Sequence, residues 1–213
     1  MGHSYILTFD IEEWYILQFH GQGSVDKYAG RYDELLNRVL DDLAKRDIKA
    51  TFFCLGKLAK QFPSVIRRIA DGGHGIACHS NEHQWLTDLS EKEFYKDTYE
   101  ALASIEDVTG EKVKGYRAPA FSIGNKNKWT LNILSELGIE YDCSIFPASR
   151  AFGGFPEFSE DKPVIVSYRG TEMKELPINV TRILGKDVAF SGGGYFRLFP
   201  FPLLKKFIGR NDY

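Results

Sequence analysis

The first two-thirds of the chain alternates between two hydrophobic patterns. Short apolar runs predict five strands, at residues 5–10, 50–55, 74–79, 113–118 and 139–143. Apolar residues at helical spacing and helix-capping signals lie between these runs and predict four helices, at residues 35–43, 63–70, 90–108 and 127–137. Strands that alternate with helices predict an α/β fold, with a parallel sheet or barrel and helices outside it.

Local signals support two of these helices in particular. Pro63 stands where a helix begins, and Gly72 follows where that helix would end. Ser90 and Glu93 have the spacing of a capping box, in which each side chain binds the backbone of the other residue.

The pattern changes after about residue 145. Glycines and prolines interrupt the chain, and Val164–Tyr168 and Met173–Ile178 are typical of β-structure. The sequence contains no composition shift typical of a linker and no internal repeat, so we expect one domain over residues 1–213.

Polar residues recur where the predicted strands end. Asp10, His79, Arg117 and Asp142 each fall at the carboxyl end of a successive predicted strand. Because barrels of parallel strands assemble their active sites at that end, we expect these side chains to share one site.

Two histidines and two carboxylates at this end have the spacing of a metal centre. His79 and His83 are four residues apart, so we expect both imidazoles on one face of a helical turn. Asp10 and Glu12 are two apart, so on a strand they point the same way. Two imidazoles, a ligand carboxylate and a second carboxylate acting as base indicate a hydrolytic metal centre.

The same histidines admit another interpretation. The string from His79 to His83 also matches the pattern of inverted zinc peptidases, in which Glu82 would be the base. That chemistry needs a long helix, and glycines at 72, 73 and 75 argue against one running into the motif. We therefore expect Glu82 to be a solvated turn residue.

Arg117 keeps its charge and binds carboxylates through two nitrogens, so it can orient Asp10.

Bulk properties narrow the class of protein. A formal net charge of −2 gives no electrostatic basis for nucleic-acid binding. No apolar run is long enough to cross a bilayer, and no signal peptide is visible. The three cysteines lie in apolar runs and predict buried free thiols in a reducing compartment, so we expect a cytoplasmic enzyme.

The motifs in their order resemble the polysaccharide deacetylase family, the NodB homology domain. They are Thr-Phe-Asp at residues 8–10, His-Ser-x-x-His at 79–83, Arg-x-Pro at 117–119 and Asp-x-Ser at 142–144. Residues 191–200 also resemble a subgroup associated with bacterial exopolysaccharide synthesis. The resemblance implies a distorted, incomplete (β/α) barrel. It also implies removal of acetyl groups from N-acetylated saccharides with one divalent metal ion, usually zinc.

The resemblance implies roles for individual residues. Asp10 matches the catalytic base, Arg117 its partner, and His79 and His83 the metal ligands. Family members usually carry two adjacent aspartates followed by glycine at the first motif, whereas this chain has Asp10-Ile11-Glu12. Glu12 is our third ligand by comparison with a peptidoglycan-deacetylase-like subgroup, and an exchange of roles between Asp10 and Glu12 stays open. We also assign substrate binding to three residues of the later motifs, Tyr116, Pro119 and Asp142.

A second departure concerns the general acid. Family members carry it as a late histidine, and no histidine occurs after His83. We expect that the chain lacks the last barrel strand, which bears this residue; otherwise catalysis would be weak or would need another acid. An open barrel edge would favour homo-oligomers. The alternative function is a saccharide-binding module that retains the metal site without catalysis.

Overall fold

The computed structural model describes residues 6–12, 29–148, 153–183, 185–190, 192 and 197–209. The chain divides into two compact units. The N-terminal unit consists of Leu7–His83 and Asp97–Val113, and the C-terminal unit contains Gln84–Lys96 and the residues from Lys114 onward.

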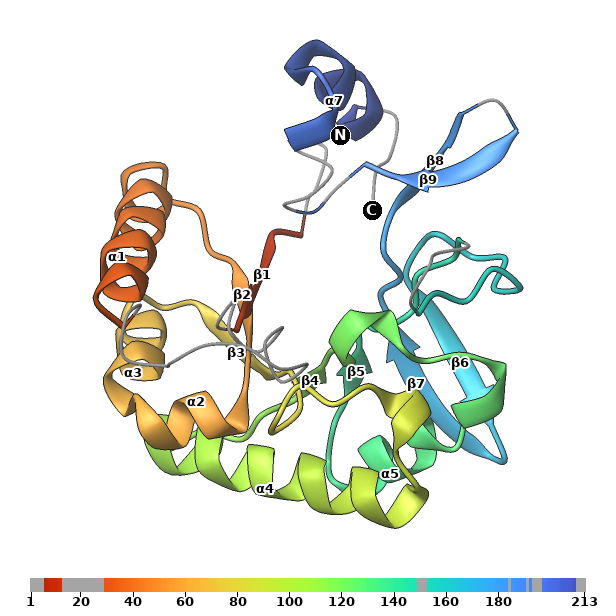
Figure 1. Cartoon of the computed structure of the whole chain (residues 1–213), viewed down its shortest axis with the longest axis horizontal. Coiled ribbons are helices and arrows are strands. Elements are labelled where there is room, and N and C mark those ends of the chain that lie inside the picture. Colours follow the sequence, from red (N-terminus) through yellow and green to blue (C-terminus); the bar gives the residue numbers. More distant parts are fainter. Residues whose placement is uncertain are drawn as a thin grey trace. The chain divides into compact units, whose positions relative to one another are not determined.

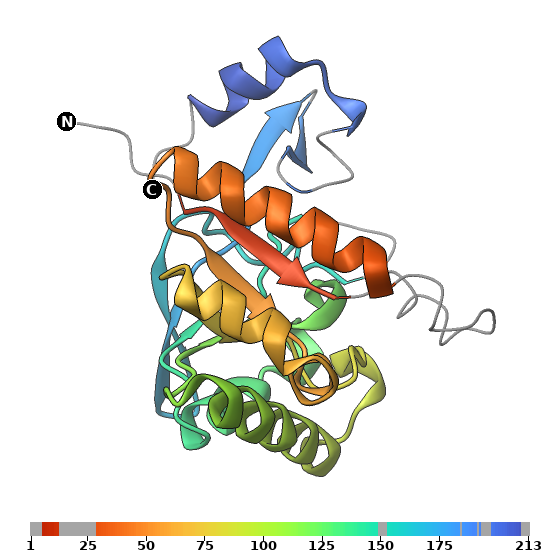
Figure 2. The ribbon, with the colours of Figure 1, turned by 90° about the vertical axis from the view of Figure 1, so that its left-hand side faces the viewer.

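The N-terminal unit is built on three parallel strands. These are β1 (Thr8–Ile11), β2 (Thr51–Cys54) and β3 (Gly75–Cys78), with β2 in the middle. The connections contain α1 (Ala29–Lys45), α2 (Gly56–Gln61) and α3 (Pro63–Asp71), and α3 packs against β3 (Figures 1 and 2). The unit also takes in α4 (Glu91–Thr109) from Asp97 on.

The core of this unit explains why its strands are almost continuously apolar. Phe52 and Phe53 point to opposite faces of β2, yet both are fully buried. A central parallel strand is covered on both faces, which favours an uninterrupted apolar run over an alternating one. Ile66 and Ile69 of α3 are also fully buried.

The C-terminal unit contains a mixed sheet. Strand β4 (Gly115–Tyr116) pairs in parallel with β5 (Tyr141–Asp142), and β5 pairs in parallel with β7 (Thr171–Glu175). Strand β6 (Val164–Tyr168) forms an antiparallel hairpin with β7. Arg169 and Gly170 at its turn both have positive φ, as a tight type I′ hairpin requires. Helix α5 (Thr130–Glu136) packs against β7 (Figure 1).

The described part of this unit also contains shorter elements. Three 3₁₀ turns are η3 (Leu86–Asp88), η4 (Pro119–Phe121) and η5 (Asn125–Asn127). A separate two-stranded antiparallel sheet contains β8 (Val180–Ile183) and β9 (Lys186–Ala189), and helix α7 (Phe201–Ile208) follows.

The structure confirms the expected α/β fold with parallel strands and helices between them. All five predicted strands are present and are shorter than predicted, although β1 ends at Ile11, one residue later than expected, and residue 5 lies outside the described part of the chain. The predicted segment Val164–Tyr168 is strand β6, and β7 begins and ends a few residues before the predicted Met173–Ile178. The capping box is also confirmed, because the Ser90 N–H donates to Glu93 Oε2 over 2.8 Å. Barrel closure, the single domain and the missing last strand stay predictions.

Two details of the helix prediction were wrong. Helix α2 was missed, because six residues are too few to show a clear apolar stripe. The segment 127–137 was predicted as one helix, but η5 ends at Asn127 and α5 begins only at Thr130. The Asn127 side chain accepts the Gly124 N–H and donates to the Ser122 carbonyl, and so holds a turn before the helix.

All three cysteines are buried free thiols, as predicted. Cys54 and Cys78 are register partners on β2 and β3, and Cys143 follows β5. Burial raises the pKa of both Cys54 and Cys78, so neither thiol readily ionises. None of the described helices is both long and apolar enough to cross a membrane. Cellular location and self-association stay predictions.

Candidate metal centre

The carboxylates at the end of β1 lie as the strand alternation predicts. Asp10 is exposed, Ile11 is buried, and Glu12, the first residue after the strand, is exposed again. Asp10 and Glu12 therefore share the face opposite to Ile11.

The two histidines lie in an irregular turn at the end of β3. Our prediction of a helical turn at this position is wrong. Residues 79–83 contain no helix, and Ser80 and His83 both have positive φ, at 70° and 61°. The Ser80 hydroxyl accepts the His83 N–H over 2.9 Å, which closes the turn through a side chain. A turn of this kind brings residues four apart together as a helix would. Glu82 is exposed and pairs with Lys57, so the prediction of a solvated turn residue is confirmed.

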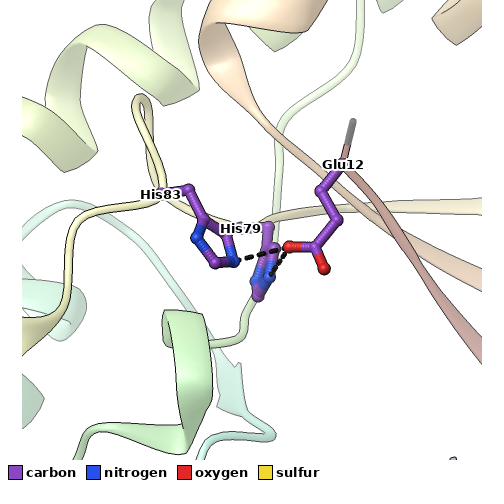
Figure 3. Close-up of side chains that lie close together, drawn as sticks. All are labelled: Glu12, His79 and His83. Carbon is purple, nitrogen blue, oxygen red and sulfur yellow. Dashed lines mark ion pairs between the residues drawn. The ribbon is translucent and has the colours of Figure 1, made fainter. Parts of the chain in front are cut away.

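The turn brings both imidazoles to the Glu12 carboxylate (Figure 3). Glu12 Oε2 lies 3.3 Å from His79 Nε2 and 2.5 Å from His83 Nε2. The side chains of His79 and His83 are 3% and 11% exposed, whereas that of Glu12 is 38% exposed. The cluster therefore has two largely buried imidazoles and a partly exposed carboxylate.

These three donors fit a small divalent cation. Zinc binds nitrogen and oxygen ligands at about 2.0–2.2 Å, so two ligands of a tetrahedral site are roughly 3.3 Å apart. The distance between Glu12 and His79 already has this value, and the shorter distance to His83 would have to open. Three protein ligands with one open side are typical of a catalytic zinc site, whereas structural sites have four.

Glu12 is in the ionised state that a carboxylate ligand needs, whereas the histidines that lower its pKa would have to be neutral to bind a metal ion. Burial alone would raise the pKa of this carboxyl. The hydrogen bonds and charges of His79 and His83 outweigh burial and leave the Glu12 pKa well below its usual range. Glu12 is therefore an anion next to two nitrogen donors, which is the charge state that a metal ligand needs.

Arg117 and Asp142 lie in the C-terminal unit, immediately after β4 and at the end of β5. Arg117 is 5% exposed, and its Nε donates to the Cys143 carbonyl over 3.3 Å. Its predicted pairing with Asp10 stays a prediction.

Asp142 belongs to a buried carboxyl pair that the sequence prediction missed. Its register partner on β7 is Glu175, and both side chains are fully buried. Ser144 donates its hydroxyl to Asp142 Oδ1, and Glu175 Oε1 accepts the Ile145 N–H over 3.1 Å. Burial raises the pKa of both carboxyls, and the charge of Asp142 raises that of Glu175 further. Burial and like charge therefore favour the protonated forms of this pair, and the charge of Arg117 opposes the shift at Glu175.

The three residues assigned to substrate binding are all buried. Tyr116 and Asp142 are fully buried, and Pro119 is buried at the start of η4. The Tyr116 ring packs edge-on against Phe94, with 5.8 Å between ring centroids. A direct contact between these side chains and a sugar would require the surrounding core to open, and their substrate role stays a prediction.

The sequence prediction also missed two residues near the Glu12–His79–His83 cluster. Asp97 is buried in α4 and accepts the Asn81 N–H over 2.9 Å. Its signal in the sequence is a carboxylate within the apolar stripe that contains Phe94, Ala101 and Ile105. Gly56, at the start of α2, lies against the turn that carries the histidines, and a Cβ there would come within 2.6 Å of Asn81 Oδ1.

Comparison with known proteins identifies the family. The sequence model described as "Polysaccharide deacetylase" matches residues 3–141, which include Glu12, His79 and His83. The chain belongs to the polysaccharide deacetylase family. Residues 143–212 match a domain of unknown function called DUF3473.

Two sequence relatives are named as deacetylases of peptidoglycan N-acetylglucosamine and of chitooligosaccharides. A peptidoglycan-N-acetylglucosamine deacetylase of Bacillus cereus is 32% identical over 127 residues, which are 57% of this chain and 46% of the relative. A chitooligosaccharide deacetylase of Azorhizobium caulinodans is 29% identical over 111 residues, 52% of this chain and 51% of the relative. The chain thus spans about half the length of either relative.

Solved structures support the fold. A protein of Mycobacterium smegmatis assigned as a polysaccharide deacetylase superposes with a TM-score of 0.68 at 23% identity, over 96% of this chain and 72% of that one. A mutant of a CE4 family pseudoenzyme, described as having restored enzymatic activity, gives a TM-score of 0.51 at 26% identity, over 64% of this chain and 43% of that one. The deacetylase family therefore contains proteins described as enzymes and proteins described as pseudoenzymes.

Proposed function

We propose that this chain carries the metal site of an amide hydrolase that removes N-acetyl groups from a polysaccharide or another amino-sugar substrate. The observation that carries the proposal is the convergence of Glu12, His79 and His83, whose ligand atoms all lie within 4.8 Å of one another and whose carboxylate is partly exposed. Carboxylate and imidazole donors suit zinc, which is the cation that we propose.

Each residue of the site has a separate task. Glu12, His79 and His83 would hold the cation, which supplies Lewis acidity and lowers the pKa of a water molecule. Asp10, on the same face of β1 as Glu12, would accept the proton of the attacking water. Arg117 would keep this base oriented and ionised. The leaving amine also needs a proton, which would come from water or from a histidine that residues 1–213 do not include.

The test is acetate release from N-acetylated oligosaccharides, measured with and without added zinc. Asp10→Asn should abolish turnover and leave the zinc content unchanged, because Asp10 is not among the three ligands. Asp41→Asn, on the exposed part of α1, is the matched control and should behave as wild type. Loss of zinc in Asp10→Asn would reverse the assignment of Asp10 and Glu12, and retained turnover would remove Asp10 as base.

The second candidate function is saccharide binding without catalysis. It is supported by the similarity to a protein described as a pseudoenzyme. It predicts that the chain with bound zinc retains an N-acetylated oligosaccharide and releases no acetate. Zinc-dependent acetate release from the same oligosaccharide excludes it.

A further inference from the structure

The turn that carries the two histidines is held at its first residues by the backbone of its neighbours. The His79 N–H donates to the Cys54 carbonyl over 2.8 Å and so continues the β2–β3 ladder by one residue. The Gly56 and Lys57 N–H groups at the start of α2 donate to the carbonyls of Ser80 and Asn81, over 3.0 and 3.2 Å. The sheet thus fixes the position of His79 independently of the rest of the turn.

The second half of the turn depends on a side chain from another element. Asp97 Oδ2, on α4, accepts the Asn81 N–H over 2.9 Å, and the Glu82 N–H also donates to this carboxylate. These N–H groups belong to the two residues that immediately precede His83. Since His83 has φ of 61°, its imidazole reaches Glu12 only if the turn is held in this conformation.

Asp97 is an unusual residue for its position. It is 8% exposed, and within the described part of the chain no lysine or arginine pairs with it. Burial raises its pKa, and the backbone N–H groups of Asn81 and Glu82 oppose that shift. Burying a carboxylate without a cation is costly, so a purely packing role would be served better by an apolar residue.

We propose that Asp97 is a positioning residue that holds His83, and not His79, in its metal-binding place. The proposal rests on the proposed function of the Glu12–His79–His83 cluster. Residues that orient metal ligands typically contribute about 10- to 100-fold to metal affinity. In this chain the carboxylate acts on the backbone of the turn and does not touch the imidazole.

The main experiment measures zinc affinity of the full chain by competition with a chromophoric chelator. Asp97→Asn keeps the size of the side chain but loses the charge and one of the two acceptors, so we expect zinc binding that is weaker by roughly 10- to 100-fold. Asp107→Asn, on the exposed part of the same helix, should match the wild type. An Asp97→Asn chain that melts at a lower temperature but binds zinc as tightly as wild type would reduce Asp97 to a structural role.

A double-mutant cycle tests the route of the effect. In a His83→Ala background the zinc affinity is already low, and Asp97→Asn should change it less than about twofold, because the ligand that it positions is gone. In a His79→Ala background the same substitution should retain its full effect. Equal effects in both backgrounds would overturn the assignment to His83.

A measurement on the wild type keeps the proposal testable if Asp97→Asn does not fold. Amide hydrogen exchange at Asn81 and Glu82 should be slow in the metal-free protein, because their N–H groups are already bound to Asp97. Exchange at the rate of an unprotected peptide would contradict the proposal. A wild-type chain that binds no zinc at all would instead refute the proposed function, so the two failures are distinguishable.

Discussion

The two units each bring titratable side chains together, but in opposite environments. In the N-terminal unit, the Glu12 carboxylate meets two imidazoles, and its side chain is 38% exposed. In the C-terminal unit, Asp142 and Glu175 meet as two carboxyls without exposure to solvent. The neighbours of Glu12 lower its pKa, whereas burial and like charge raise the pKa values of the pair.

The difference shows that the partner and the solvent decide what a carboxyl group can do. An anion beside two nitrogen donors and an open side is suited to bind a cation and a substrate. A carboxyl pair that is sealed from water favours its protonated form, and it lies between two paired strands. The first is therefore our candidate for chemistry and the second for stability.

The largest effect is expected when one donor is removed from the Glu12–His79–His83 cluster. His83→Ala removes one of three converging donors, so zinc affinity should fall by more than about 100-fold, beyond the loss expected for a residue that only orients a ligand. The readout is zinc affinity by chelator competition. His74→Gln is the control, because His74 accepts the Ala50 N–H and lies outside the cluster. If His83→Ala bound zinc as tightly as the wild type, these three residues would not be the zinc site.

The next effect tests the sealed pair through pH. Both carboxyl pKa values are raised in the folded protein, so above about pH 4.5 the folded state binds more protons than the unfolded state. The free energy of unfolding should therefore fall as pH rises, by up to about 1.4 kcal/mol per pH unit for each shifted group. Glu175→Gln can still accept the Ile145 N–H and donate to Asp142, and its slope should be smaller.

Urea unfolding at several values between pH 5 and pH 8 measures this slope. Glu172→Gln, on the exposed face of the same strand, is the control and should retain the wild-type slope. If wild type and Glu175→Gln have the same slope, the pair does not hold a proton in the folded state.

A smaller effect is expected from a substitution at Gly56, which lies against the histidine turn and does not belong to the Glu12–His79–His83 cluster. In Gly56→Ala the new Cβ would lie 2.4 Å from the Cα of Ala101, so the chain should lose about 1–3 kcal/mol of unfolding free energy. Gly124→Ala places its Cβ no closer than 3.9 Å to a neighbour and should cost much less. Equal losses in the two variants would show that the close approach at Gly56 relaxes freely.

The smallest effect concerns the hydroxyl that closes the histidine turn. Ser80→Ala loses the hydrogen bond from the His83 N–H, which is worth about 0.5–1.5 kcal/mol. Urea unfolding should show this loss, whereas Ser104→Ala, which removes an exposed hydroxyl on α4, should show less. A larger loss in Ser104→Ala would contradict the importance of the turn.

The sequence predicted which strand ends carry the motifs and which three donors converge, because these depend on local signals. An apolar run that ends in Asp10-Ile11-Glu12 fixes which side chains share a face, and glycines after α3 mark where β3 begins. The turn at residues 79–83 was mistaken for a helical one because both conformations bring residues four apart together. Only the positive φ values of Ser80 and His83 distinguish them.

The missed residues all depend on contacts between elements that are distant in sequence. Asp97 meets the turn across 16 residues, and Glu175 meets Asp142 across strands that are 33 positions apart. Local pattern indicates only that each is an acid at an apolar position, which is equally typical of a solvated helix end or strand end. The sequence contains even less indication of the importance of Gly56, because this glycine matters through the close approach that the absence of a Cβ allows.

The buried cysteines supply a native reporter of how each unit opens. Cys54 and Cys78 lie in the N-terminal unit and Cys143 in the C-terminal unit, and all three are closed to reagents in the folded state. A thiol of this kind reacts only when the surrounding structure transiently unfolds, so its alkylation rate measures the free energy of that opening. One labelling experiment read by mass spectrometry therefore gives two stabilities. Added zinc, if it binds at Glu12, His79 and His83, should slow the reaction at Cys54 and Cys78 directly.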